Sequence, residues 1–177
     1  TGKTEVSSGK SGGGIIQCAA EWQDAAPEQK AILDTIAYAE GTTSCGISKS
    51  VPSYNIMLGC RVIKDLSKHP RETGEMPPGG FHFGNEGKTS TASGRYQFLY
   101  CNPDNPKNKG CTNFFPNGFG PIEQDKEAWK RIEQKHKVSL DDVKNAGQDL
   151  SKLSLIWDKL APEWASIRDS TKGSSYY

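Results

Sequence analysis

Glycine and proline divide this chain into helical stretches and a broken central segment. Apolar residues recur at helical spacing from Pro27 onward, and Gly41 supplies a stop, so we predict a helix that ends at about Glu40. By contrast, residues 70–90 contain eight glycines and prolines, too many backbone breakers for a regular element. We predict a long surface loop there, and its part from Gly74 to Gly87 is either a mobile lip or a disordered loop.

The second half of the chain carries three further helical patterns. Residues 122–137 are charged with apolar residues on one side, and Ser139 begins a capping box whose helix Gly147 can end. Asp149 can cap a last helix, which Pro162 ends. We expect the apolar stripe of this last helix to be core rather than a binding groove; it consists of Leu150, Leu153, Ile156, Trp157 and Leu160.

Strand patterns are weaker and lie near the middle of the chain. Residues 54–58 and 61–63 are typical of two short strands around a turn at Gly59. Together with the helical patterns, they predict an α+β fold that is mainly helical, with a small β-hairpin on one side.

Length and composition exclude several classes of protein. A chain of 177 residues with a mean hydropathy of −0.68 is typical of one water-soluble domain, which we place at residues 21–170 between flexible tails at 1–20 and 171–177. No apolar run approaches the about 18 residues of a membrane span. The net charge of +1 argues against nucleic acid as a partner, because polyanion binding needs a surplus of Lys and Arg. We expect a monomer.

Five cysteines point to an oxidising compartment. Cys45 and Cys60 flank one loop region, and Cys101 and Cys111 flank another, so we predict a disulfide in each. Cys18 is then free, joined to another chain, or part of a different pairing. We expect no metal site, since the chain has no C-x2-C pair and its three histidines are scattered. For a secreted or periplasmic protein, a signal peptide would have been removed ahead of Thr1.

Glu40 is the first candidate for chemistry. Successive helical residues are about 100° apart, so Glu40 lies on the same face as Ile32 and Ile36, where the pattern requires an apolar side chain. Burial and the negative end of the helix dipole both disfavour the ionised carboxylate and should raise the pKa of Glu40. A carboxyl that stays protonated near neutral pH can donate a proton to a leaving-group oxygen. The alternative is a frayed helix end with the side chain in solvent.

Several motifs occur in a characteristic order. They are Ala31–Thr42 with its Glu-Gly-Thr end, Tyr54–Gly59, Asp65–Ser67 with His69–Arg71, and Ser90–Gln97 with the pattern Ser-Thr-x-x-Gly-Arg-Tyr-Gln. Weaker matches are Pro121 with Gln124-Asp125, and Ile156-Trp157 with Leu160. In this order the motifs resemble those of the lambda-phage endolysin family, from Pro27 to about Ala165.

This resemblance implies a lysozyme-like fold and an enzyme that degrades peptidoglycan without a cofactor. The bond cut would be the β-1,4 link between N-acetylmuramic acid and N-acetylglucosamine, with Glu40 as the acid and then the base. In the family the usual product is a 1,6-anhydromuramic end, made when the sugar's own C6 hydroxyl replaces water as the attacking group. Such a lytic transglycosylase needs no second carboxylate, whereas most glycosidases hold two carboxyls about 5 to 9.5 Å apart.

Asn55 stands where the phage enzyme has Asp. An amide cannot serve as nucleophile or ionised base, but it can hydrogen-bond an acetamido or hydroxyl group, so the preference for modified glycans, such as deacetylated ones, would differ; the alternative is a plain strand residue. Water activation by another carboxylate would make the enzyme a hydrolytic lysozyme. The candidates in or near the long loop are Asp65, Glu72, Glu75 and Glu86.

Four further residues are candidate sugar contacts. We expect Gly94–Gln97 to begin a helix that lines the cleft, where Tyr96 stacks on a sugar face and Gln97 hydrogen-bonds it. Arg95 and Tyr96 could equally be packing or ion-pair residues. Tyr54 would help to position the bond, because a phenol both packs and donates, and Ser93 would lie at the cleft edge.

Two other classes of function remain open at this point. An odd number of cysteines and three histidines would suit a thiol hydrolase of wall peptides, although no cysteine-centred motif is present. The departure at Asn55 and the long tail would suit a non-catalytic wall-binding module.

Overall fold

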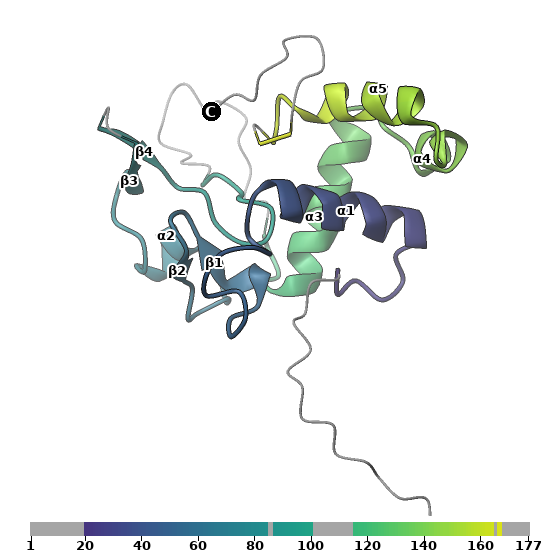
Figure 1. Ribbon diagram of the computed structural model, residues 1–177. Coiled ribbons are helices and arrows are strands. Elements are labelled where there is room, and N and C mark those ends of the chain that lie inside the picture. Colours follow the sequence, from purple (N-terminus) through teal and green to yellow (C-terminus); the bar gives the residue numbers. More distant parts are fainter. Residues whose placement is uncertain (1–19, 85–86, 101–114, 165, 168–177) are drawn as a thin grey trace, which may run out of the picture.

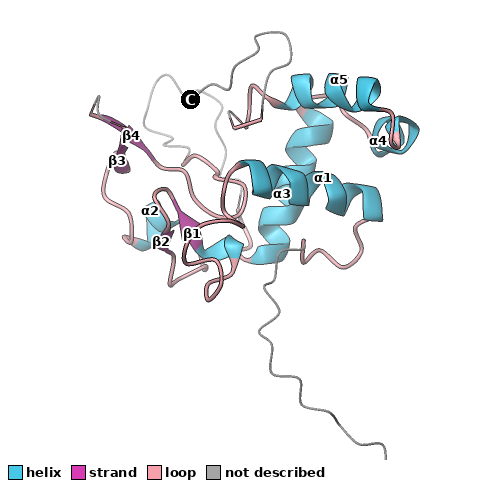
Figure 2. Cartoon of the chain, viewed as in Figure 1, coloured by secondary structure: helices cyan, strands magenta, loops and turns pink. Residues whose placement is uncertain are grey.

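The computed structural model describes residues 20–84, 87–100, 115–164 and 166–167. Figure 1 shows two hairpins on one side of helix α1 and helices α4 and α5 on the other, with α3 crossing α1. The elements, coloured by type in Figure 2, are α1 Pro27–Ala39, the 3₁₀ turn η1 Ser53–Asn55, β1 Ile56–Met57, β2 Arg61–Val62, α2 Pro70–Thr73, β3 Phe81–Phe83, β4 Lys88–Ser90, α3 Pro121–Gln134, α4 Leu140–Ala146 and α5 Leu150–Leu160. The predicted class, mainly helical α+β, is confirmed.

Helix boundaries follow from their caps. α1 begins with Pro27 at its first position and is followed by Gly41 in the left-handed region (φ 72°), the stop expected from the sequence. The capping box of α4 is present, since the Ser139 hydroxyl accepts from the N–H of Asp142. Asp149 caps α5 by accepting from the N–H groups of Ser151 and Lys152.

The prediction of an unbroken loop over residues 70–90 is wrong. Pro70 and Gly74 do not interrupt a loop; they begin and end the short helix α2, whose N-cap His69 accepts from the N–H of Arg71 (3.2 Å). Further on, β3 and β4 form an antiparallel hairpin. A Cβ on Gly80 would lie 2.1 Å from the carbonyl oxygen of Ser90, so glycine is needed there for the close approach of the chain to the end of β4. The breakers of this segment therefore shape regular elements.

The predicted helix at Gly94–Gln97 is also wrong. Ser93 and Phe98 exchange two backbone hydrogen bonds, so these four residues form the turn of a tight hairpin. Gly94 and Gln97 both have positive φ, 76° and 48°, which a right-handed helix forbids. The turn lies against β1, because the N–H of Gly94 donates to the carbonyl of Ile56 (2.8 Å).

The other predicted strands are shorter than expected. Residues 54 and 55 belong to η1 rather than to a strand, while Ile56–Met57 and Arg61–Val62 pair in the expected antiparallel hairpin. The predicted disulfide between Cys45 and Cys60 is present, with a Cα–Cα distance of 5.8 Å, and it ties the segment after α1 to the turn of this hairpin. Cys18, Cys101 and Cys111 lie outside the described residues.

One core connects the two sides of the molecule. α1 packs against α3 and α4, and α4 packs against α5. Edge-on aromatic contacts, with ring centroids 4.6–5.7 Å apart, extend the core under the hairpins through Tyr96, Phe98, Phe115 and Phe119. Ala20 is buried and donates its N–H to Asp34 (2.8 Å), so ordered packing begins by residue 20; the rest of both predicted tails lies outside the described residues.

The apolar stripe of α5 is only partly core. Ile156 and Leu160 are buried, but Leu150 is 81% exposed, and Leu153 and Trp157 are half-buried. Leu153 and Trp157 pack against the core, so the expectation that the stripe is core is wrong only for Leu150. In the described part of the chain, no helix is long and apolar enough to cross a membrane.

Candidate active site

Glu40 lies at the end of α1, where the chain leaves the helix in a fixed way. Glu40 is the C-cap, Gly41 donates its N–H to the carbonyl of Tyr38 (3.0 Å), and Thr42 donates its N–H to that of Ala37 (3.2 Å). This pair of bonds is the Schellman arrangement, which requires the left-handed residue that Gly41 supplies. The Glu-Gly-Thr sequence thus sets the direction in which the Glu40 side chain leaves the helix.

The Glu40 carboxyl is half-buried and hydrogen-bonded. Ser166, in the turn that follows α5, donates its hydroxyl to Oε1 of Glu40. Burial raises the pKa of Glu40 above its ordinary value, and the bonds from the side chain and backbone of Ser166 lower it in part. The geometry supports the buried carboxyl rather than a frayed end in solvent, and the raised pKa favours the protonated form that an acid catalyst needs.

Thr42 joins the end of α1 to the hairpin side of the molecule. Its buried hydroxyl lies 2.8 Å from the carbonyl oxygen of Arg95, to which it donates. The Arg95 guanidinium has no exposed surface; it donates to Ser53 and pairs with Asp34 of α1, both at 2.6 Å. Arg95 is therefore the packing and ion-pair residue that was one of its two predicted roles.

A buried carboxylate on α3 organises two tyrosines of the hairpin side. Asp125 on α3 accepts from the hydroxyls of Tyr54 (2.9 Å) and Tyr96 (2.6 Å) and from the N–H of Trp22 (2.8 Å). Burial is the main cause that raises the pKa of Asp125, and these three bonds oppose it. Burial and the neighbouring Asp125 charge raise the pKa of both phenols.

Three of the predicted sugar contacts are enclosed in this structure. Tyr54, Ser93 and Tyr96 have no exposed surface. The hydroxyls of the two tyrosines are held by Asp125, and that of Ser93 donates to the carbonyl of Thr91 (3.0 Å). Tyr96 cannot stack on a sugar face from this position, and all three residues are held inside the fold by their hydrogen bonds.

Asn55 and Gln97 are the predicted contacts that remain partly exposed. The Asn55 amide donates to the carbonyl of Ile63 (2.9 Å) across the β1–β2 hairpin. The Gln97 amide donates to the carbonyls of Gly94 (2.9 Å) and Ile56 (3.2 Å). The Oδ1 of Asn55 and the Oε1 of Gln97 take no part in these bonds, since an amide oxygen accepts and does not donate.

The alternative carboxylates are placed on the hairpin side. Glu75 accepts from the N–H groups of Lys64 and Asp65, both at 2.8 Å, and Asp65 accepts from the N–H of Ser67 (2.8 Å). Glu72 is exposed on α2. Glu86 lies outside the described residues. Two of these groups thus serve the local backbone.

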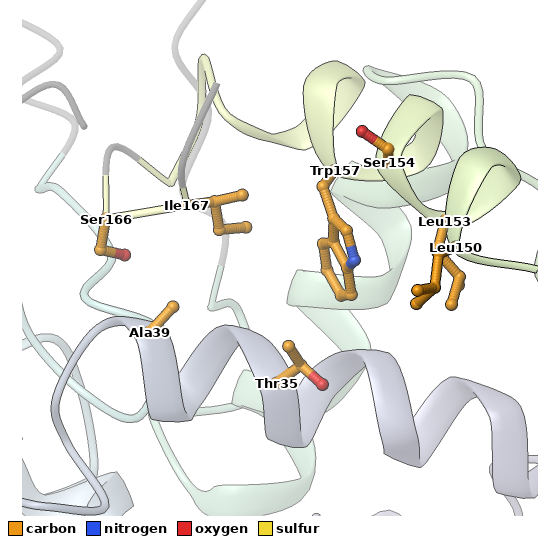
Figure 3. Close-up of a pocket in the computed structure, with 8 residues that line it drawn as sticks. All are labelled: Thr35, Ala39, Leu150, Leu153, Ser154, Trp157, Ser166 and Ile167. Atoms are coloured by element: carbon orange, nitrogen blue, oxygen red, sulfur yellow. The ribbon is translucent and has the colours of Figure 1, made fainter. Parts of the chain in front are cut away.

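A groove of about 360 Å³ adjoins Glu40 between α1 and α5. Figure 3 shows Ser166 and Ala39 at one end of the groove, Leu150 and Leu153 at the other, and Trp157 pointing into it. Its lining is mainly apolar, with hydroxyls from Thr35, Ser154 and Ser166. Within the described ranges no group of three or more His, Cys, Asp or Glu side chains is arranged to hold a metal ion.

Sequence reasoning did not identify Ser166 or Asp34 at this site. Ser166 is 126 positions from Glu40, and the sequence holds no periodic signal that would join them. Asp125 is part of a weak family motif, but nothing in its own pattern separates it from the charged face of α3. The burial of Arg95, which calls for a carboxylate partner such as Asp34, is evident only from the structure.

Known proteins match this chain in sequence and in fold. The endolysin of Escherichia phage lambda is 28% identical over 134 residues, which span 75% of this chain and 77% of the phage protein. Lysozyme from bacteriophage lambda has a similar fold, with a TM-score of 0.63, 23% identity, and 85% of this chain and 86% of that chain covered. Bacteriophage lambda lysozyme complexed with a chitohexasaccharide gives a TM-score of 0.60 at 24% identity and the same coverage.

The fold comparison confirms the predicted lysozyme-like architecture. The model of the family described as Endolysin matches residues 30–176, which include Glu40, both hairpins and α3 to α5. That match covers most of the sequence, so the chain belongs to the endolysin family.

Proposed function

We propose that this protein degrades peptidoglycan as a lysozyme-like enzyme, with Glu40 as its catalytic acid. The bond cut is the β-1,4 link between N-acetylmuramic acid and N-acetylglucosamine. The observation that carries this proposal is the half-buried Glu40 carboxyl, whose pKa is raised by burial and which a fixed helix end presents. Membership of the endolysin family and the saccharide complex of lambda lysozyme support a glycan as the ligand.

The chemistry requires Glu40 in both of its protonation states. Protonated Glu40 gives its proton to the glycosidic oxygen of the leaving N-acetylglucosamine as the C1–O bond of the muramic residue breaks. The ionised carboxylate then takes the proton of the hydroxyl that attacks C1. A raised pKa favours the protonated form that the first step needs.

We propose the C6 hydroxyl of the muramic residue as the attacking group. The product is then a 1,6-anhydromuramic end, and no water is consumed. Support comes from the amide at Asn55, which cannot act as an ionised base, and from the local backbone contacts that Asp65 and Glu75 make. A hydrolytic lysozyme, which would need a second group to activate water, is the second candidate.

Glu40→Gln tests the proposed acid. The amide keeps the size of the side chain but has no proton to donate, so solubilisation of purified sacculi should fall by at least about a hundredfold. Glu133→Gln, at an exposed position on α3, is the matched control and should keep the normal rate. A normal rate in Glu40→Gln would show that Glu40 is not the acid.

The masses of the released fragments distinguish the two chemistries. Transglycosylation gives muramic ends that are lighter by one water than the ends that hydrolysis gives. Defined sacculi, acetylated and deacetylated, measure the glycan preference in the same experiment. Sacculi that bind the wild-type protein but release no soluble fragment would identify a wall-binding module instead.

We further propose that the protein works outside the cytoplasm, in a periplasmic or secreted location. The Cys45–Cys60 disulfide supports this location, because such bonds persist mainly in oxidising compartments. The same bond removes these two cysteines as candidate thiol nucleophiles. Activity that survives complete thiol alkylation would also exclude a thiol hydrolase.

A further inference from the structure

The Glu40 carboxyl has one side-chain partner that comes from a distant part of the chain. Ser166 donates its hydroxyl to Oε1 of Glu40. Ser166 follows α5 and lies at the end of the groove that α1 and α5 form (Figure 3). The contact therefore connects the end of the first helix to the turn after the last one.

The turn that carries Ser166 is held in place from two directions. Trp164 is buried and donates its indole N–H to the carbonyl of Tyr96 (3.1 Å), on the hairpin side. Glu163 accepts from Arg131 (2.6 Å) and pairs with Lys135, both near the end of α3. Ile167, on the other side of Ser166, is also buried. A hydroxyl on such a turn has little freedom to leave Glu40, so its hydrogen bond orients the carboxyl.

Charged groups on the surrounding elements have their own partners. Arg95 pairs with Asp34, Asp125 accepts from two tyrosines, and Glu163 lies among Arg131, Lys135 and His136. Burial is the main cause that raises the pKa of Glu40, and the hydrogen bond from Ser166 lowers it in part. Ser166 thus stabilises the ionised form of the carboxyl.

We infer that Ser166 is a positioning residue for Glu40: by holding Oε1 it leaves Oε2 to carry the proton toward the glycosidic oxygen and to take one back. The inference rests on the proposed function, in which Glu40 is the acid and the base. Ser166, although remote from Glu40 in sequence, would then influence both the catalytic rate and the pH range of activity.

The bond has a definite electrostatic effect. A hydroxyl that donates to a carboxylate stabilises the ionised form, so Ser166 lowers the pKa of Glu40 from the level that burial alone would set. Without this hydroxyl the pKa rises further. Because the acid step needs protonated Glu40, the alkaline limb of the kcat/KM profile should then move to higher pH.

Ser166→Ala and Ser166→Thr form the test pair, with Ser151→Ala as the control. Threonine keeps the hydroxyl and alanine removes it, while Ser151 is exposed on α5 and lies outside the lining of the groove. In solubilisation of sacculi, we expect Ser166→Ala to lower kcat by roughly tenfold, the loss of one charge-assisted hydrogen bond, with KM unchanged. Its alkaline limb should move upward, Ser166→Thr should restore both properties, and Ser151→Ala should match the wild type.

Two results would overturn the inference. One is a Ser166→Ala enzyme with the normal rate and profile; the other is a reduced rate with an unmoved alkaline limb, which would indicate only a structural role. Titration of the Glu40 carboxyl by carbon NMR, in folded wild type and Ser166→Ala, measures the same bond without any substrate. A pKa that rises in Ser166→Ala together with an active Glu40→Gln enzyme would mean that the contact is real and the proposed acid is wrong.

Discussion

At the scale of single residues, Glu40 is a group whose burial works against stability. Burial raises its pKa above the ordinary value of 4.5, so the folded protein holds the proton of Glu40 more tightly than the unfolded chain does. The stability that this binding contributes is fully present below pH 4.5 and is lost as pH rises through the folded-state pKa. At neutral pH the ionised, partly buried carboxylate therefore lowers the stability of the folded protein.

Glu40→Gln should therefore stabilise the protein in a pH-dependent way. A glutamine cannot ionise and can still accept from Ser166, so the variant avoids the loss that the wild type shows as pH rises. We expect it to be more stable at pH 8 by about 0.5–2 kcal/mol, with the difference falling toward zero near pH 4. Urea unfolding at both pH values measures this difference, with Glu72→Gln as the exposed control. A difference that does not change with pH would contradict the burial argument.

The prediction of single residues from the sequence was accurate where the signal is local. Glu40 and Gly41 follow from the periodicity and end of one helix, and both occupy the expected positions. Tyr96 was expected at a cleft, but its phenol is buried against Asp125, 29 positions away. No periodic pattern in the sequence marks Asp125 or Ser166 as a partner, because a hydrogen bond between distant segments depends on the assembled fold.

At the scale of elements, α5 divides between core and surface. Its first turn presents Leu150 to solvent beside the groove, whereas Leu160, at its last turn, has no exposed surface. Helical spacing shows which residues share a face but not how far the neighbouring helix extends along that face. α5 packs against α4, and its first half borders the groove instead of filling it.

Two truncations on this helix should have very different effects. Leu160→Ala removes buried methyl groups and leaves a cavity, so it should lower the free energy of unfolding by about 2–5 kcal/mol. Leu150→Ala removes a side chain that is 81% exposed and should change stability by less than about 0.5 kcal/mol. Chemical unfolding of the two variants checks the prediction. Equal losses would mean that the whole stripe is core.

The short elements on the hairpin side were the least predictable from the sequence. Their glycines and prolines were interpreted as loop breakers, yet Pro70 and Gly74 delimit α2, and Gly80 allows the chain to approach the end of β4. Each of these elements has four residues or fewer, too few for a periodic pattern to be visible. Long-range contacts, which a local pattern does not contain, decide their conformation.

At the scale of the whole molecule, the Cys45–Cys60 disulfide is the covalent link between the α1 segment and the β1–β2 hairpin. It closes a loop with a sequence separation of 15, which corresponds to about 3 kcal/mol when the entropy of the unfolded chain is considered. The bond should therefore contribute to the relative placement of Glu40 and Asn55, which lie on either side of Cys45.

Removal of this disulfide should lower the free energy of unfolding. We expect the double variant Cys45→Ser with Cys60→Ser to lose up to about 3 kcal/mol of unfolding free energy under non-reducing conditions. Reduction of the wild type by a thiol should produce a similar loss, and the same treatment should affect the double variant less. Thermal and urea unfolding measure the losses. An unchanged stability in the double variant would show that other contacts already hold the loop.

The Asp125 cluster has a consequence for how the chain reaches its fold. Asp125 binds Tyr96, Tyr54 and Trp22, which precede it by 29, 71 and 103 positions. None of these contacts can form early from neighbouring residues, and long loops must close before any of them is gained. A fragment that stops before α3 would have to bury two phenols with no acceptor. The hairpin side should therefore not fold ahead of α3, and refolding should be a slow, concerted event in which distant segments meet together.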